Sequence, residues 1–108
     1  MPLPTETDVS RALTHLAATD GPVGVLRARV KGLEYQRKVI YGLAFLDATG
    51  TVGEREATAY ASSTYRAFVE DYENAVAECE TMAAKRKRAE LTIEVWRSLN
   101  ANQRRGNI

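Results

Sequence analysis

The sequence has very few of the residues that usually build a chemical centre. Its 108 residues include one histidine, one cysteine and one tryptophan, and only 7% are aromatic. A single cysteine, Cys79, excludes an intramolecular disulfide, and we expect it to be a small core residue in a reducing compartment. His15 has no cysteine or acidic cluster at ligand spacing, so the pattern predicts no metal site.

Signals for catalysis are missing as well. The sequence has no glycine-rich phosphate loop, no nucleophile elbow and no recognisable Cys–His or Ser–His–Asp arrangement. The acidic residues between positions 70 and 80 could supply a carboxylate pair, but we interpret them as a solvated helix face. We therefore expect no catalytic residues, no cofactor and no enzymatic activity.

Membrane signals are absent from the sequence too. No apolar run reaches the roughly eighteen residues that cross a bilayer, and the N-terminus lacks a basic and then apolar leader. We expect a cytoplasmic protein with no membrane partner.

The residues that are abundant favour helix. A hydrophobic share of 44% with seven glycines and three prolines indicates a folded chain, and its length suits one domain, residues 1–108. From residue 61 to residue 96 one apolar seam returns in alternating steps of four and three residues, which is a heptad signature. The members of this seam are Ala61, Tyr65, Phe68, Tyr72, Ala75, Cys79, Met82, Arg86, Ala89, Ile93 and Trp96.

Helix-breaking and capping residues divide the chain into three predicted helices, at about residues 6–19, 22–48 and 54–103. Thr5 and Asp8 resemble a capping box, and Asp20-Gly21-Pro22 is expected to stop the first helix. Two glycines in residues 49–53 are expected to reverse the chain. The fold class is all-α, with a short N-terminal helix and an antiparallel hairpin that ends in a very long, coiled-coil-like helix.

The middle helix has a wide apolar face. Its seam of Val23, Leu26, Val30, Leu33, Ile40 and Ala44 is widened by Val25, Val39, Leu43 and Leu46. Such a width implies contact with more than one helix.

The long helix of the predicted hairpin is longer than the helix it packs against. Laid antiparallel from the turn, residues 80–103 overhang by roughly 35 Å at the standard helical rise. Folding back of the N-terminal helix would cover part of one side. Because the overhang carries two apolar stripes, we expect other subunits to cover it as well, in a homo-oligomer. The expected interface residues are Met82, Ala89, Leu91, Ile93, Val95, Trp96 and Leu99.

Charge is strongly segregated although the net charge is only +1. Residues 48–80 carry seven acidic and two basic side chains, whereas residues 81–108 carry seven basic and two acidic ones. Much of the basic charge lies in the run at 85–88, which wraps the helix because successive residues are 100° apart. The predicted nucleic-acid contacts are Lys85, Arg86, Lys87, Arg88, Arg97, Arg104 and Arg105. Intersubunit pairing with the acidic segment, or plain solvation, would explain the same cations.

Three residues keep two interpretations open. Arg86 lies on the seam, where it reaches solvent, pairs or sets the helix register. Trp96 is either an interface residue or a base-stacking one beside Arg97. Tyr35 and Tyr41, near Arg37 and Lys38, form a second aromatic and basic cluster whose simpler role is packing.

The stretch from Leu33 to Ile108 resembles small helical proteins of tailed phages. The residues that carry the likeness are Gly-Thr-Val-Gly-Glu-Arg-Glu-Ala at 50–57, the segment from Tyr65 to Tyr72, Lys-Arg-Lys-Arg-Ala-Glu-Leu-Thr-Ile-Glu-Val-Trp-Arg-Ser-Leu-Asn at 85–100, and Arg-Arg-Gly-Asn-Ile at 104–108. The plan also loosely resembles the recombination mediators of T-even phages. Those proteins are non-enzymatic and oligomeric, and they bind single-stranded DNA while loading a recombinase.

The resemblance implies a phage-type recombination accessory protein in the cytoplasm of the host cell. Its partners would be single-stranded DNA and a recombinase or annealing protein, with the basic residues named above on the DNA. The alternative is a helical protein-binding adaptor or inhibitor without a nucleic-acid ligand, which needs Ile93, Trp96 and Leu99 exposed.

Overall fold

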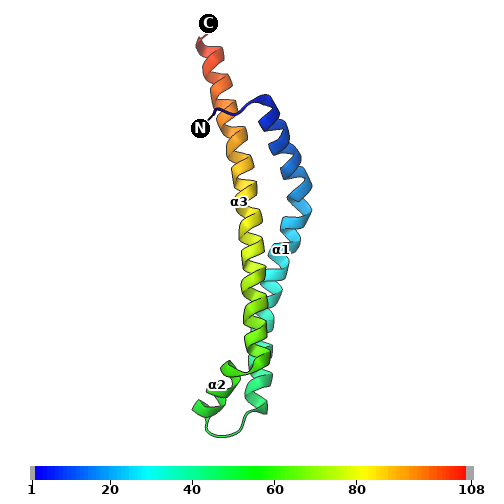
Figure 1. Ribbon diagram of the computed structural model, residues 1–108, viewed down its shortest axis with the longest axis vertical. Helices are drawn as coiled ribbons and strands as arrows, with labels where there is room; N and C mark the ends of the chain where they lie inside the picture. Colours follow the sequence, from blue (N-terminus) through cyan, green and yellow to red (C-terminus); the bar gives the residue numbers. More distant parts are fainter. Residues whose placement is uncertain (1, 107–108) are drawn as a thin grey trace. The chain divides into compact units, whose positions relative to one another are not determined.

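Three helices make up almost all of residues 2–106, the part of the chain that the computed structural model describes. They are α1 (Glu6–Asp47), α2 (Val52–Ala61) and α3 (Ser63–Gly106), as labelled in Figure 1. Met1, Asn107 and Ile108, which enter the predicted extended N-terminus and the C-terminal resemblance, lie outside the described residues. The all-α prediction is confirmed for the described part.

The chain forms two compact units, each built from one segment of α1 and one of α3. Unit 1 is Met1–Gly24 with Glu80–Ile108, and unit 2 is Val25–Cys79, which also contains α2. In unit 2 the two long helices are antiparallel, because Arg37, Glu34 and Arg29 of α1 contact residues progressively further along α3. Their partners are Tyr65, Tyr72 and Glu78, respectively.

The start of α1 is capped as the sequence predicts. The hydroxyl of Thr5 accepts a hydrogen bond from the backbone N–H of Asp8, and the Asp8 carboxylate accepts one from the backbone N–H of Thr5. These reciprocal bonds satisfy two amide donors that the first turn leaves open. The bonds from Thr5 also hold the pKa of the Asp8 carboxyl below its usual value, because they favour the ionised form.

The predicted break at Asp20-Gly21-Pro22 is wrong, since α1 continues through it to Asp47. Pro22 lacks an N–H and therefore frees the carbonyl of Ala18, but Ala18 is exposed and water can hydrate that oxygen. Val23 directly after the proline is buried and favours the continuous helix. Tertiary packing thus overrides the local signal.

The predicted single helix from 54 to 103 is also divided, at Ser62. This residue has extended backbone angles of φ −62° and ψ 146°, and its hydroxyl accepts from the N–H of Tyr65 while donating to the carbonyl of Ala59. Ser62 therefore ends α2 and begins α3 as an N-cap. Ala61, the first member of the predicted seam, is exposed and lies outside α3.

The seam itself faces the interior within each unit. Tyr65, Phe68 and Ala75 are buried in unit 2, and Ala89 is buried in unit 1. In unit 1 the N-terminal segment of α1 contacts α3 through Leu16, and Val9 and Ala12 of that segment are buried. The predicted overhang without cover from its own polypeptide is therefore wrong, because α1 does not turn back at Pro22.

Between α1 and α2 the chain turns at Gly50, whose φ of +112° is a conformation that favours glycine. A Cβ at this position would displace the flexible carboxylate end of Glu54, so the positive φ is the main cost of adding a side chain. We expect Gly50→Ala to lower the free energy of unfolding by about 1–2 kcal/mol in urea denaturation.

Gly53 is the matched control for this substitution, because it lies in the first turns of α2 and a Cβ there meets nothing within 4 Å. Gly53→Ala should stabilise by about 0.5–1 kcal/mol through helix propensity. Equal effects of the two substitutions would contradict the strained turn.

Candidate functional site

The basic run on α3 lies in unit 1 and divides into one inward and three outward side chains. Arg86 is half-buried, whereas Lys85, Lys87 and Arg88 are exposed. Because consecutive residues point 100° apart, the run does not form one cationic face.

Arg86 is held by α1. Its guanidinium donates to the carbonyl of Leu16 at 2.9 Å and to the hydroxyl of Thr19 at 2.6 Å. It also forms an ion pair with the carboxylate of Asp20 at 2.6 Å, and its side chain is 16% exposed. These contacts occupy the Arg86 guanidinium and give it a structural role.

The other cations predicted to contact nucleic acid are exposed. Lys87 lies 3.8 Å from Glu90 in an i,i+3 ion pair, which is weak at an exposed site. Among the described residues, no ion pair involves Lys85, Arg88, Arg97, Arg104 or Arg105. Lys85 and Arg88 are one helical turn apart and therefore lie close together, and Arg104 and Arg105 occupy the last turn.

The residues predicted to form an oligomer interface fall into two groups. Ala89 is buried, and Met82, Ile93, Trp96 and Leu99 are half-buried in unit 1. Leu91 and Val95 are exposed. Leu91 lies three residues after Arg88, so the exposed apolar pair adjoins the exposed cations.

A row of aromatic rings fills unit 2. Ring centroids lie 4.8 Å apart for Tyr41 and Tyr60, 5.4 Å for Tyr60 and Tyr65, and 6.3 Å for Tyr65 and Phe68. The guanidinium of Arg55 sits 4.5 Å from the centroid of Phe45 at the end of α1. These contacts join α2 to both long helices, which the sequence did not indicate.

Polar groups at the edge of this row are paired. Arg37 donates to the hydroxyl of Tyr65 at 3.2 Å, and this bond raises the pKa of Arg37. Tyr72 donates to Glu34 at 3.0 Å, which raises the pKa of the Tyr72 phenol. Loss of solvent contact raises the pKa of Tyr41. All three groups therefore keep their ordinary charge state at neutral pH.

The predicted aromatic and basic cluster of Tyr35 and Tyr41 is split by the fold. Tyr41 belongs to the aromatic row, whereas Tyr35 is 84% exposed on the other side of α1. Tyr41 packs against other aromatic rings, whereas the exposed Tyr35 has no packing role within unit 2.

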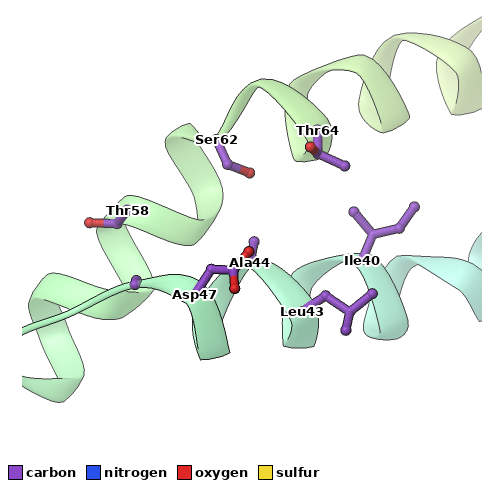
Figure 2. Close-up of a pocket in the computed structure, with 8 residues that line it drawn as sticks. Ile40, Leu43, Ala44, Asp47, Thr58, Ser62 and Thr64 are labelled. Atoms are coloured by element: carbon purple, nitrogen blue, oxygen red, sulfur yellow. The ribbon is translucent and has the colours of Figure 1, made fainter.

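A hollow of about 250 Å³ lies in unit 2 where α1, α2 and α3 meet, as Figure 2 shows. Ile40, Leu43 and Ala44 line one side. The hydroxyls of Thr58 and Ser62 donate to backbone carbonyls, those of Glu54 and Ala59 respectively, and are not free to bind a ligand as donors. Asp47 is the one charged side chain in its lining, so the hollow offers no acid–base pair.

Among residues 2–106, no three of the His, Cys, Asp and Glu side chains gather where they would hold a metal ion. None of the helices in the described part of the chain is long and apolar enough to cross a membrane.

The comparisons with known proteins found no matching family model, no similar curated protein and no similar solved structure.

Proposed function

We propose that this chain is a non-enzymatic accessory protein of DNA recombination, of the phage type, that binds single-stranded DNA through α3. The observation that carries the proposal is the set of exposed cations in unit 1 without an ion-pair partner among the described residues. They are Lys85, Arg88, Arg97, Arg104 and Arg105. Exposed cations of this kind contact phosphates and release counterions, which makes binding salt-sensitive.

The pairing of Arg86 supports this proposal. Asp20 is the carboxylate that contacts the basic run from α1, and Arg86 neutralises it. Lys85 and Arg88 are therefore spared a neighbouring carboxylate that would repel a phosphate backbone. In a homo-oligomer the cations of several subunits would add to one binding surface, which presents the strand to a recombinase or annealing protein.

The direct test is fluorescence anisotropy with a labelled oligo-dT strand over a series of salt concentrations. We expect the double variant Lys85→Ala, Arg88→Ala to bind at least about tenfold more weakly at low salt. Its log–log salt slope should fall by about 1.4, since each phosphate contact on a single strand contributes about 0.7.

Arg66→Ala is the control, because Arg66 is an exposed arginine on α3 that lies in unit 2, within the acidic segment 48–80. It should bind as the wild type does. Wild-type protein that does not bind at low salt, or binds with no salt dependence, would reject the proposal.

A protein-binding adaptor or inhibitor without a nucleic-acid ligand is the second candidate. The exposure of Leu91 and Val95 favours it, since exposed apolar side chains on a helix suit a protein partner. The half-burial of Ile93, Trp96 and Leu99 does not, because this alternative needs them accessible. Failure of the anisotropy experiment would favour this second function.

A further inference from the structure

α1 carries a second apolar stripe within unit 2, on the side away from α3. Seven positions return in steps of three and four residues over three heptads, which is the pattern of a helix-packing seam. We call them the outer stripe: Val25, Ala28, Gly32, Tyr35, Val39, Gly42 and Leu46. The large members are strongly exposed, with Tyr35 at 84% and Val39 at 57%.

The outer stripe has no partner in its own unit. Leu26, Leu33 and Ala44 form the inner face of the same helix, and a rotation of 100° per residue puts them opposite the stripe. A Cβ placed on Gly32 or Gly42 would meet nothing within 4 Å. The helix is therefore apolar on two sides, and unit 2 covers one of them.

The two glycines point to another helix. Glycine is unfavourable inside a helix, and neither Gly32 nor Gly42 has a positive φ or a close neighbour that requires it. A second backbone packed closely against the stripe would require small residues at these positions. Leu43 extends the apolar surface into the hollow of Figure 2, so the surface is contiguous.

The charges beside the outer stripe favour one segment of the chain as its binding partner. The stripe is flanked by exposed Lys31 and Lys38, which lie one turn before and after Tyr35. An antiparallel copy of α1 would place these lysines against each other. The α3 segment of unit 2 instead offers exposed Glu70 and Glu73 beside half-buried Val69 and Val76. Neither glutamate takes part in an ion pair within the described residues.

We propose that the outer stripe is the docking site for a second copy of this chain, with the segment 69–76 of that copy's α3 lying along it. Each chain supplies one stripe and one acidic segment, so two copies have complementary surfaces through which to pair. The apolar stripe supplies the buried surface, and the lysine–glutamate contacts set the register.

The first experiment measures the oligomeric state of the full chain by sedimentation equilibrium. The wild type should be dimeric, and Val39→Glu should raise the dimer dissociation constant by at least about tenfold, because it buries an unpaired charge. Val39 is exposed, so the helical circular dichroism at low concentration should not change. Leu13→Glu is the control at an exposed leucine of unit 1, 55% exposed, and should leave the dimer intact.

The second experiment tests the identity of the docked surface. The charge reversal Lys31→Glu, Lys38→Glu should weaken the dimer, and so should Glu70→Lys, Glu73→Lys. The quadruple variant should restore wild-type affinity. A monomeric wild type, a dimer unaffected by Val39→Glu, or a quadruple variant without recovery would each overturn the proposal.

Discussion

Phe68→Ala is expected to lower the free energy of unfolding by about 3–5 kcal/mol, the range for removing a buried aromatic side chain. Phe68 is 5% exposed and lies in the aromatic row of unit 2. Its ring centroid is 6.3 Å from that of Tyr65 and 6.2 Å from that of Tyr72. Truncation therefore opens a cavity between these two rings.

Urea denaturation followed by circular dichroism at one fixed protein concentration measures this loss, since a dimer would make stability depend on concentration. Leu13→Ala removes an exposed apolar side chain of α1 and should cost less than about 1 kcal/mol. Phe68→Leu should cost less than about 1.5 kcal/mol, because it keeps most of the volume. Similar losses for Phe68→Ala and Leu13→Ala would show that the aromatic row is not a packed core.

Helical periodicity carries most of what the sequence predicts correctly about this fold. The step of three and four residues along α3 identifies Tyr65, Phe68, Ala75 and Ala89, and all four are buried. Burial of one helical face repeats about once per turn of 3.6 residues, and the sequence records that repetition directly. The same regularity makes the all-α class predictable.

Helix ends are harder to predict, because local signals compete with packing. Asp20-Gly21-Pro22 is a strong breaker, yet α1 passes through it where Val23 is buried and Ala18 faces solvent. Ser62 is a weak signal, yet its hydroxyl bonds both helices that meet there. Neither outcome follows from propensity, since each depends on residues that are distant in sequence or on backbone geometry.

The candidate site shows the same limit. The sequence gathers the cations of residues 85–88 but does not separate the one that pairs from those that stay exposed. That separation rests on contacts between Arg86 and residues of α1 almost seventy positions earlier. Part of the outer stripe could have been predicted from the sequence, because Val25, Val39 and Leu46 already appear there as residues that widen the apolar face of the helix. That they lie on the face of α1 opposite the one that contacts α3 followed only from the contacts in the structure.

Arg86→Ala is expected to destabilise the protein by about 2–3 kcal/mol, because hydrogen bonds from a charged donor are each worth more than neutral ones. The variant loses the bonds to Leu16 and Thr19 and the ion pair with Asp20. The alkyl stem of a side chain that is only 16% exposed is lost as well. Asp20 keeps its solvation, since its side chain is 70% exposed, and so it adds little penalty.

Arg88→Ala is the matched control, an exposed arginine two residues further along the same helix, and should change stability by less than about 0.5 kcal/mol. Arg86→Lys should recover part of the loss, since an ammonium group reaches one acceptor but lacks the planar guanidinium that donates to three.

Urea denaturation ranks the three variants by stability, and oligo-dT anisotropy measured on the same samples separates a structural role from a DNA-binding one. If Arg86 acts by holding α1, Arg86→Ala chiefly lowers stability, and the folded fraction loses only the smaller share of DNA affinity that an unneutralised Asp20 costs. Arg88→Ala shows the opposite pattern. Equal stability of the two alanine variants would contradict the structural role, because nothing else distinguishes these neighbouring arginines so clearly.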